Sequence, residues 1–503
     1  MMKKYTLNDY ALLLENARMM KVFYTGFADA DQEIEYLTFD SKKVVEGTLF
    51  ICKGAAFKAE YLDEAISKGA VAYVSEKEYE TKADVPYFIV DDIRKAMPLL
   101  AEKFNNEAWK KLNIVGIGGT KGKSTSACYM KAVLDDYCLN NQKKETALIS
   151  SIDTYDGVIR KESNLTTPEA VELQEHFRHA VESEIEYLQM EVSSQALKYG
   201  RVDNMMFDVG IFLNISEDHI SPIEHPDFED YFSSKLTMFK KCKYAVINKD
   251  ADFAERIQEA ASVCEKVLTF SITDETADVY GYQIQKDGNE TVFQVKTTQF
   301  DEEFRLAMPG IFNVENALSV IAAAMLLEIP VKYMKSGLER ARTSGRMELY
   351  TSKDMQRIAI VDFAHNKLSF EKLIASTREE YPDYKIVMVF GCPGNKANIR
   401  RQHLGEVAGE MADQIYLTAD DPAYEKVEDI CAEIAQFIGE KCPYKIIADR
   451  TEAIRTAMAE AEGKTAFLVT GKGDEAWLKY ENKKVPCKSD VENVKECLAE
   501  YDK

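Results

Sequence analysis

From about residue 109 onward, short apolar runs alternate with longer amphipathic stretches. The runs LNIVGIGG, YLQMEV, FDVGIFLNIS and YAVINKD are typical of buried strands, and STSACYMKAVLDDY is typical of a helix that covers them. This alternation predicts a mainly parallel sheet with helices on both faces. Between Val279 and Leu306 the pattern changes to VYGYQIQKDGNETVFQVKTTQFDEEFRL, which predicts antiparallel hairpins with a turn at KDGN.

A second block of the same kind begins near Gly345. Its expected strands are, in order, RIAIVDFAH, KIVMVFGCPG, QIYLTADDP, YKIIADR and TAFLVTGKG. Each strand ends in a polar or glycine-rich cluster, and open parallel sheets bind ligands at the carboxyl ends of their strands. We therefore expect the five clusters to meet at one site. The alternative is that each cluster is an ordinary turn between a strand and a helix.

The first hundred residues carry shorter elements. GTLFICKG and VAYVSE are typical of strands, EYLDEAISKGA is typical of a helix, and the polar stretch Lys103 to Lys111 suggests a linker. A chain of 503 residues is too long for a single core. The sequence therefore predicts an α/β protein with three domains, at residues 1–108, 109–344 and 345–503.

Composition excludes several classes of protein. Apolar residues make up 46% of the chain and charged residues 29%, as in ordinary globular proteins, and no apolar run is long enough for a membrane span. The amino-terminal stretch turns polar and acidic too soon for a signal peptide, so we expect a cytoplasmic protein. The net charge of −22 argues against nucleic-acid binding, and ten scattered cysteines without a C-x-x-C pair favour reduced thiols. We expect a monomer with neither a nucleic-acid nor a membrane partner.

The stretch GIGGTKGKST, from Gly116 to Thr125, carries the clearest candidate chemistry. It joins a predicted strand to a predicted helix, although the strict phosphate-loop pattern would need glycine in place of Ile117. Backbone amides and Lys123 would bind phosphates, and the Ser124 hydroxyl could bind Mg²⁺. A glycine-rich turn with a chance Gly-Lys-Ser is the alternative. The expected ATP-binding residues are Gly119, Thr120, Lys121, Gly122, Lys123, Ser124 and Thr125.

With one extra residue, this loop resembles that of the Mur ligases, ATP-dependent enzymes that add amino acids during peptidoglycan assembly. Other segments resemble the family in the same order: SNLTTPEA, MEVSSQALKYGRV, NISEDHI, YFSSKLTMF, GIFNVENALSV, SGRMEL, VDFAH, VFGCPGNK, ADDPA and GKGDE. DSKKVVEGTLFICKGAAF is similar to the amino-terminal domain of the MurE type. The resemblance covers essentially the whole chain. It implies a small uridine-binding α/β domain, a central P-loop ATPase domain with a parallel sheet, and a Rossmann-like carboxyl-terminal domain.

The resemblance also implies roles for the matching positions. The catalytic residues would be Lys123, Glu191, His219, Lys235, Asp362 and His365, with Lys235 carbamylated. The Mg²⁺ ligands would be Ser124, Glu191, His219 and Lys235, and further ATP contacts would be Asn313, Asn316 and Arg346. The UDP-muramoyl peptide would contact Ser41, Lys42, Thr166, Thr167, Ser193 and Arg201. The added amino acid would contact Lys396, Asp420, Asp421, Ala423, Gly471 and Glu475.

Several of these residues also have a purely structural interpretation. His219 could be an ordinary loop histidine, Lys235 a solvated helical lysine and Asn313 a helix cap. His176 and His179 stand three residues apart in EHFRH without further ligands, and we interpret them as surface residues.

The reaction that the resemblance implies is peptide-bond formation through an acyl phosphate. ATP would phosphorylate the free carboxylate of UDP-N-acetylmuramoyl-L-alanyl-D-glutamate, and an amino acid would then displace phosphate. The diaminopimelate-adding subtype grips the distal carboxylate with an arginine, where this chain has Ala423. Leaving that carboxylate unpaired would cost about 1–3 kcal/mol or more, whereas Asp421 and Glu425 favour an ammonium group. We therefore expect L-lysine, with ornithine or meso-diaminopimelate as alternatives.

The chain departs from the family pattern at Gln195, Tyr199, Lys367, Pro393 and Asp474, and Lys396 stands where arginine is usual. The phosphate and metal positions are retained, so the departures bear on substrate details rather than on ATP use. Two other functions stay open. One is a related amide ligase with another acceptor, as in folylpolyglutamate or cyanophycin synthesis, and the other is an inactive nucleotide-binding regulator.

Overall fold

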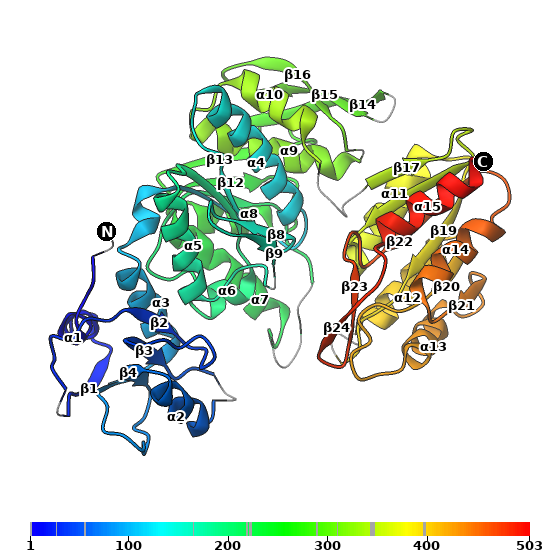
Figure 1. The fold of residues 1–503 in the computed structure, drawn as a ribbon. Coiled ribbons are helices and arrows are strands. Elements are labelled where there is room, and N and C mark those ends of the chain that lie inside the picture. The colour runs from blue at the N-terminus through cyan, green and yellow to red at the C-terminus, as the bar shows by residue number, and fades with distance from the viewer. Residues whose placement is uncertain are drawn as a thin grey trace.

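The computed structural model describes residues 3–26, 28–54, 57–163, 165–217, 220, 224–287, 290–308, 310–342, 348–395 and 399–503. Three large sheets follow one another along the chain, and Figure 1 shows them as three bodies, coloured blue, cyan to green, and yellow to red. Among the described residues, every helix is too short or too polar to cross a bilayer. The sheets lie within the three predicted residue ranges, whose boundaries themselves stay predictions.

The amino-terminal sheet has the strand order β1-β5-β4-β3-β2. Its strands are β1 (Met20–Tyr24), β2 (Tyr36–Thr38), β3 (Thr48–Ile51), β4 (Ala70–Ser75) and β5 (Tyr87–Val90), and all neighbours except β1 and β5 run parallel. Its helices are α1 (Leu7–Asn16), α2 (Ala59–Ser67) and α3 (Ile93–Phe104). The strands and the helix expected from GTLFICKG, VAYVSE and EYLDEAISKGA are confirmed.

The stretch from Lys103 to Lys111 is partly helical, and its role as a linker stays a prediction. The apolar face of α3 is buried as far as Phe104, which keeps Lys103 and Phe104 in the helix, and a short 3-10 helix, η1, spans Ala108–Lys111.

The central sheet has the strand order β16-β15-β14-β13-β12-β11-β6-β10-β7-β8-β9. Its parallel part consists of β6 (Asn113–Gly118), β7 (Ala147–Ile149), β10 (Tyr187–Glu191), β11 (Phe207–Phe212), β12 (Cys242–Asn248) and β13 (Lys266–Ser271). One edge is extended by β14 (Val279–Asp287), β15 (Glu290–Lys296) and β16 (Asp301–Leu306), which confirms the expected hairpins. The other edge carries an antiparallel hairpin that the sequence did not predict, β8 (Asp153–Tyr155) and β9 (Arg160–Glu162).

Helices cover both faces of the central sheet, as the alternation along β6 requires. Val115 and Ile117 pack in a core with α4 (Lys123–Asn140) and α9 (Ile311–Leu326), whereas Ile114 packs in another with α5 (Ala170–Glu182). The remaining helices are α6 (Ser194–Lys198), α7 (Phe228–Leu236), the 3-10 helix η2 (Thr237–Lys241), α8 (Ala254–Ala261) and α10 (Val331–Arg340).

The carboxyl-terminal sheet has the strand order β17-β18-β22-β19-β20-β21, and all its neighbours except β17 and β18 run parallel. The strands are β17 (Glu348–Thr351), β18 (Arg357–Asp362), β19 (Lys385–Phe390), β20 (Gln414–Leu417), β21 (Tyr444–Ile446) and β22 (Thr465–Thr470). The five predicted strands are therefore confirmed as β18 to β22.

Helices also cover both faces of this sheet. α11 (Lys367–Glu380), α12 (Ile399–Met411) and α13 (Val427–Ile438) pack on one face, and α14 (Arg450–Glu460) and α15 (Asp490–Tyr501) on the other. A separate hairpin is formed by β23 (Trp477–Tyr480) and β24 (Lys483–Pro486).

Candidate active site

The glycine-rich loop joins β6 to the amino terminus of α4. Gly119 and Gly122 have φ angles of 141° and 83°, in the region that favours glycine, and Gly122 is the N-cap of α4. A Cβ atom at Gly122 would collide with the side-chain amide of Asn316 on α9. The loop thus has the strand–turn–helix context that a phosphate-binding loop needs.

The segment after β11 holds this loop in place. The backbone N–H of Thr120 donates to the Asn214 carbonyl at 3.1 Å, and that of Lys121 donates to Asn214 Oδ1 at 2.9 Å. Asn214 Nδ2 donates back to the Lys121 carbonyl at 3.2 Å, and the Ser216 N–H donates to Thr120 Oγ1 at 3.1 Å. Asn214 was not predicted as a site residue, although it lies near the end of the apolar run FDVGIFLNIS and begins the segment NISEDHI.

Two lysines converge on one carbonyl of the loop. Lys123 Nζ donates to the carbonyls of Gly119 and Thr120, both at 3.1 Å, and Lys235 Nζ donates to the Gly119 carbonyl at 2.7 Å. Lys235 is only 3% exposed, and its Nζ lies 4.9 Å from the centre of the Tyr231 ring. The interpretation of Lys235 as a solvated lysine is therefore wrong.

A serine connects two of the three candidate metal ligands that the structure describes, Ser124 and Glu191. Ser124 Oγ lies 3.0 Å from Ser151 Oγ, and the N–H and hydroxyl of Ser151 donate to Glu191 Oε1 at 2.8 and 3.1 Å. Hydroxyl and carboxylate oxygens are the donors that Mg²⁺ prefers, so this pair fits a magnesium site. Ser151, after β7, was missed because one serine after a short strand resembles any turn residue. His219, Arg346 and Lys396 lie outside the described residues.

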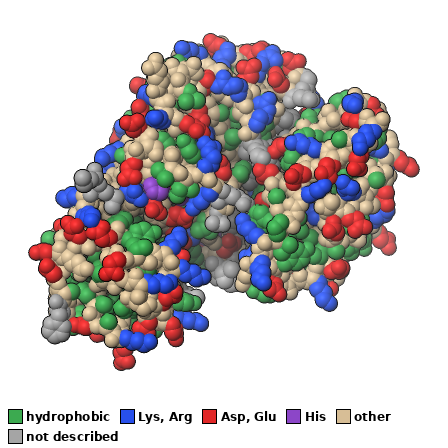
Figure 2. All heavy atoms as spheres, in the orientation of Figure 1, with side chains coloured by type: hydrophobic (Ala, Val, Ile, Leu, Met, Phe, Trp, Pro, Cys, Tyr) green, Lys and Arg blue, Asp and Glu red, His purple; other side chains and the backbone are tan. Residues whose placement is uncertain are grey.

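A cavity of about 320 Å³ lies between the central and carboxyl-terminal sheets. It joins the predicted ATP residues of the central body, Lys121, Gly122, Thr125 and Asn316, to Asp362 and His365 at the end of β18. Its size falls in the range of small-molecule sites, about 300–1,000 Å³. Figure 2 shows the molecule hollowed between the carboxyl-terminal body and the rest.

Other residues of the cavity wall were not predicted or differ from their predictions. Asn248, Glu315 and Lys372 line the cavity without having been singled out. Asn313 does not cap α9, because the N-cap is Gly310. Its side chain is fully buried, and of the two predicted asparagines only Asn316 is among the described residues that line the cavity.

Three residues of the central body that were predicted to contact the muramoyl peptide form one hydrogen-bonded group next to Glu191. They are Thr167, Ser193 and Arg201. Thr167 Oγ1 donates to the Glu191 carbonyl at 2.9 Å and accepts from the Ser193 N–H at 3.0 Å, and Arg201 Nη1 donates to the Thr167 carbonyl at 3.1 Å. Thr166 adjoins this group in the chain. Ser41 donates to Glu64 at 2.7 Å and the Lys42 N–H to Asp40 at 2.9 Å, so these contacts stay within the amino-terminal body.

Lys53, after β3, links the amino-terminal body to that group. It pairs with Glu169, which also accepts from Arg201 Nη2 at 2.9 Å. Burial lowers the pKa of Lys53, and the nearby charges of Arg201 and Arg94 lower it further, although Glu169 opposes them. Two cations share one carboxylate here, which suits an anionic ligand. Lys53 was missed because its partner is 116 residues away.

Two of the departures from the family pattern lie nearby. The Arg94 guanidinium lies 4.6 Å from the centre of the Tyr199 ring, and Gln195 Nε2 donates to Glu224 at 3.0 Å.

The amino-acid residues predicted at the ends of β20 and β22 also lie together. Lys472 Nζ lies 3.0 Å from Asp421 Oδ1, pairs with Glu475, and lies 3.9 Å from the centre of the Trp477 ring. A Cβ at Gly471 would lie 2.6 Å from Asp420 Oδ2. Burial raises the pKa of Asp420 and of Glu475. Lys472 is 2% exposed and was not predicted.

The acids expected to attract a substrate ammonium already have internal partners. Arg401 Nη2 donates to both carboxylate oxygens of Glu425 at 2.9 Å, and Lys472 pairs with Asp421. Ala423 is tied to the β23–β24 hairpin, because its N–H donates to the Lys479 carbonyl at 3.0 Å and its carbonyl accepts from the Glu481 N–H at 2.7 Å. The carboxylates are thus held in fixed positions before any substrate arrives.

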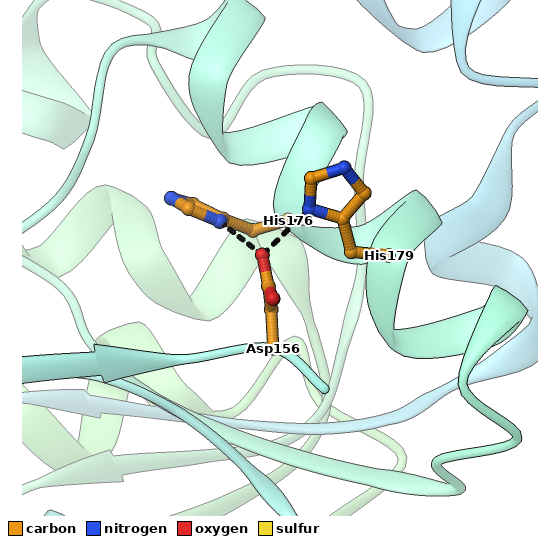
Figure 3. A group of neighbouring side chains, drawn as sticks. All are labelled: Asp156, His176 and His179. Carbon is orange, nitrogen blue, oxygen red and sulfur yellow. Dashed lines mark hydrogen bonds and ion pairs between the residues drawn. The ribbon is translucent and has the colours of Figure 1, made fainter. Parts of the chain in front are cut away.

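His176 and His179 are not surface residues, so that prediction was wrong. They are 1% and 9% exposed, and their Nδ1 atoms lie 2.6 and 2.8 Å from Asp156 Oδ2 (Figure 3). The backbone N–H groups of Val158 and Ile159 donate to Asp156 Oδ1. The Asp156 carboxylate thus takes part in four hydrogen bonds, and these tie the unpredicted β8–β9 hairpin to α5.

Comparisons with known proteins match this arrangement. The family described as Mur ligase middle domain matches residues 117–324, and the Mur ligase, glutamate ligase domain matches residues 345–473. The chain is 39% identical over 453 residues to the UDP-N-acetylmuramoyl-L-alanyl-D-glutamate--L-lysine ligase of Streptococcus pneumoniae serotype 4, covering 89% of each chain.

Solved structures share the fold. A UDP-N-acetylmuramoyl-L-alanyl-D-glutamate--2,6-diaminopimelate ligase aligns with a TM-score of 0.67 at 23% identity, covering 99% of both chains. The MurF ligase of Thermotoga maritima, solved in complex with ADP, aligns with a TM-score of 0.63 at 18% identity over 92% of this chain and 97% of its own.

Proposed function

The chain belongs to the Mur ligase family, and on that premise we propose that it adds L-lysine to UDP-N-acetylmuramoyl-L-alanyl-D-glutamate at the expense of ATP. The observation that carries the proposal is the 39% identity, over 89% of the chain, to an enzyme named for that reaction. The absence of arginine at Ala423 and the surplus of acids around it support lysine over diaminopimelate.

The central body would bind ATP in the 320 Å³ cavity. Lys123 would exchange its two carbonyl partners for the terminal phosphates, and the amide groups of residues 119–125 would line the phosphate chain. Asn316 would face the nucleoside from α9, and Asp362 and His365 would approach from the carboxyl-terminal body. Arg346 would add a further ATP contact.

Mg²⁺ would be held by Ser124, Glu191, His219 and a carbamylated Lys235. Bound there, it would neutralise the charge that gathers where a carboxylate meets the terminal phosphate. Burial of Lys235 agrees with this modification, which needs a neutral amine that water does not solvate.

The acceptor would lie along the group of Thr166, Thr167, Ser193 and Arg201, with Lys53 near its anionic part and Ser41 and Lys42 on the uridine side. Lysine would bind at Asp420, Asp421, Gly471 and Glu475, and Lys396 would be a further contact. Its α-amine attacks the acyl carbon of the acyl phosphate, the new C–N bond forms, and phosphate leaves with the bonding pair. Positioning supplies most of the rate, because the enzyme forms no covalent bond itself.

Turnover with matched substrates tests the proposal. The purified chain is supplied with ATP, Mg²⁺ and the UDP-muramoyl dipeptide, and phosphate release and tripeptide formation are measured with lysine, ornithine and meso-diaminopimelate. Lysine should exceed diaminopimelate in kcat/KM by about tenfold or more, the effect of about 1.4 kcal/mol. Higher turnover with diaminopimelate would refute the choice of lysine. A lack of acceptor-dependent phosphate release would refute the ligase itself.

A further inference from the structure

A row of three hydrogen-bonded side chains lies beside the proposed site, and the proposed function gives none of them a contact with substrate. His225 is fully buried, its Nε2 lies 2.9 Å from Ser194 Oγ, and its Nδ1 lies 2.5 Å from Asp230 Oδ1. The order Ser-His-Asp is that of a nucleophilic triad. Ser194 is only 4% exposed, however, which keeps its hydroxyl from substrate, so the row acts on the enzyme's own structure.

One end of the row lies on the acceptor side of the site. Ser194 is the first residue of α6 and directly follows Ser193, the N-cap of that helix. The Ser193 N–H donates to Thr167 Oγ1, which donates to the Glu191 carbonyl. A shift of α6 therefore moves the residues that hold the muramoyl peptide.

The other end lies on the phosphate side. Asp230 belongs to α7, which also carries Tyr231 and Lys235. The His225 ring contacts the Tyr231 ring edge-on, with centres 5.2 Å apart. The Tyr231 hydroxyl lies 3.0 Å from Thr120 Oγ1 in the phosphate loop. A shift of α7 therefore moves Lys235 and the loop.

Lys198 of α6 also pairs directly with Asp230 Oδ1 of α7 at 2.5 Å. We propose that His225 is a positioning residue that, together with this ion pair, sets the distance between α6 and α7, and with it the distance between the acceptor carboxylate and the ATP phosphates. This inference rests on the proposed function, because it needs both substrates where that function places them. The His225 backbone also forms a β-bridge with Ile220. This bridge ties the segment before α7 to the segment that follows β11. Displacing reacting groups by about 1 Å can cost about a hundredfold in rate.

The chain offers a matched control for this proposal. His176 is also buried, also hydrogen-bonded to an aspartate, and also in the central body, but it ties α5 to the β8–β9 hairpin (Figure 3). His225→Ala and His176→Ala each remove one buried imidazole from an aspartate. We expect comparable losses in Tm, whereas kcat should fall about a hundredfold in His225→Ala alone. The KM values for ATP and lysine should stay within about threefold, because no residue that contacts them is changed.

A second variant covers the case in which His225→Ala does not fold. Ser194→Ala deletes one oxygen and opens the same row, so kcat should fall about tenfold with little change in Tm. The kcat of the double variant should be no lower than that of His225→Ala, because both changes break the same row of hydrogen bonds. The positioning role would be refuted if the kcat losses of the two single variants multiply in the double variant, or if His176→Ala loses as much kcat as His225→Ala. It would also be refuted if kcat in either single variant stays within about twofold of the unmodified enzyme. Lysine-dependent turnover of the unmodified enzyme tests the proposed function separately.

Discussion

The carboxyl ends of the central and carboxyl-terminal sheets both carry lysines bonded to other groups of the protein, but these lysines have different partners. At the central sheet, Lys123 and Lys235 donate to backbone carbonyls of the phosphate loop. At the carboxyl-terminal sheet, Lys472 pairs with two carboxylates, Asp421 and Glu475.

The different partners of these lysines indicate different roles. A hydrogen bond from an ammonium group to a carbonyl contributes about 1.5–3 kcal/mol net, so a charged phosphate can take Lys123 from these carbonyls at a smaller cost than breaking an ion pair. Breaking a buried ion pair costs about 3–5 kcal/mol, so Lys472 stays with its acids. We infer that the central lysines bind ligand, whereas Lys472 holds two carboxylates in position for a ligand.

The largest effect is expected for Lys123→Ala. Removing the cation that we propose to meet the terminal phosphates should lower kcat/KM by about a thousandfold. The Tm should stay within about 2 °C, because Lys123 is not buried and its hydrogen bonds to the Gly119 and Thr120 carbonyls lie in a solvent-accessible loop. Steady-state phosphate release and a thermal scan measure both quantities. A large loss of Tm would show that Lys123 stabilises the fold. It would contradict the proposed difference between the lysines of the two sheets.

A loss of about a hundredfold in kcat is expected for Lys235→Ala, whose amine is buried against the Gly119 carbonyl. If the active form is carbamylated, a small carboxylic acid added to the variant should restore part of the rate by replacing the missing oxygens. Added chloride at equal ionic strength is the control. Full activity in Lys235→Ala would refute the proposed metal-ligand role.

The repeating strands and the phosphate loop could be predicted from sequence because their signals are local. Apolar runs at regular intervals gave β6, β10, β11 and β18 to β22, and glycines before Gly-Lys-Ser gave the loop. The resemblance supplied positions such as Glu191 and Asp421, which the fold brings to the expected edges.

The missed residues act through contacts between distant segments. Ser151 is 40 residues from Glu191, Lys472 is 51 from Asp421, and Ser194 is 31 from His225. Ser151 has an ordinary neighbourhood in the chain. Lys472 and Ser194 lie in the segments GKGDE and MEVSSQALKYGRV, but nothing within those segments indicates their distant partners. His176 and His179 were misjudged for the same reason: their partner, Asp156, lies in a hairpin of three-residue strands too short to give a periodic signal.

Lys472→Met tests the structural half of the contrast. The change leaves Asp421 and Glu475 without their shared cation, so the free energy of unfolding should fall by about 3 kcal/mol, the low end for a broken buried pair. The KM for lysine should change by about tenfold as the two acids move, while the KM for ATP stays within about twofold. Urea unfolding and initial rates measure these effects. A variant with normal stability but no activity would instead place Lys472 among the catalytic residues.

The smallest effect is expected from pH at the lysine site. Burial raises the pKa of Glu475 above its usual range, and although burial opposes it, the neighbouring carboxylates raise the pKa of the Lys472 ammonium. As pH falls through the raised pKa of Glu475, its carboxylate gains a proton and the site loses a negative charge, while the substrate ammonium keeps its positive charge. The KM for lysine should therefore rise about threefold to tenfold on acidification, the equivalent of about 1 kcal/mol. Glu475→Gln, which is neutral at every pH, should have a raised KM that no longer changes over this range. An unmodified enzyme whose KM for lysine is flat, or falls on acidification, would show that the acids at this edge do not face the incoming ammonium.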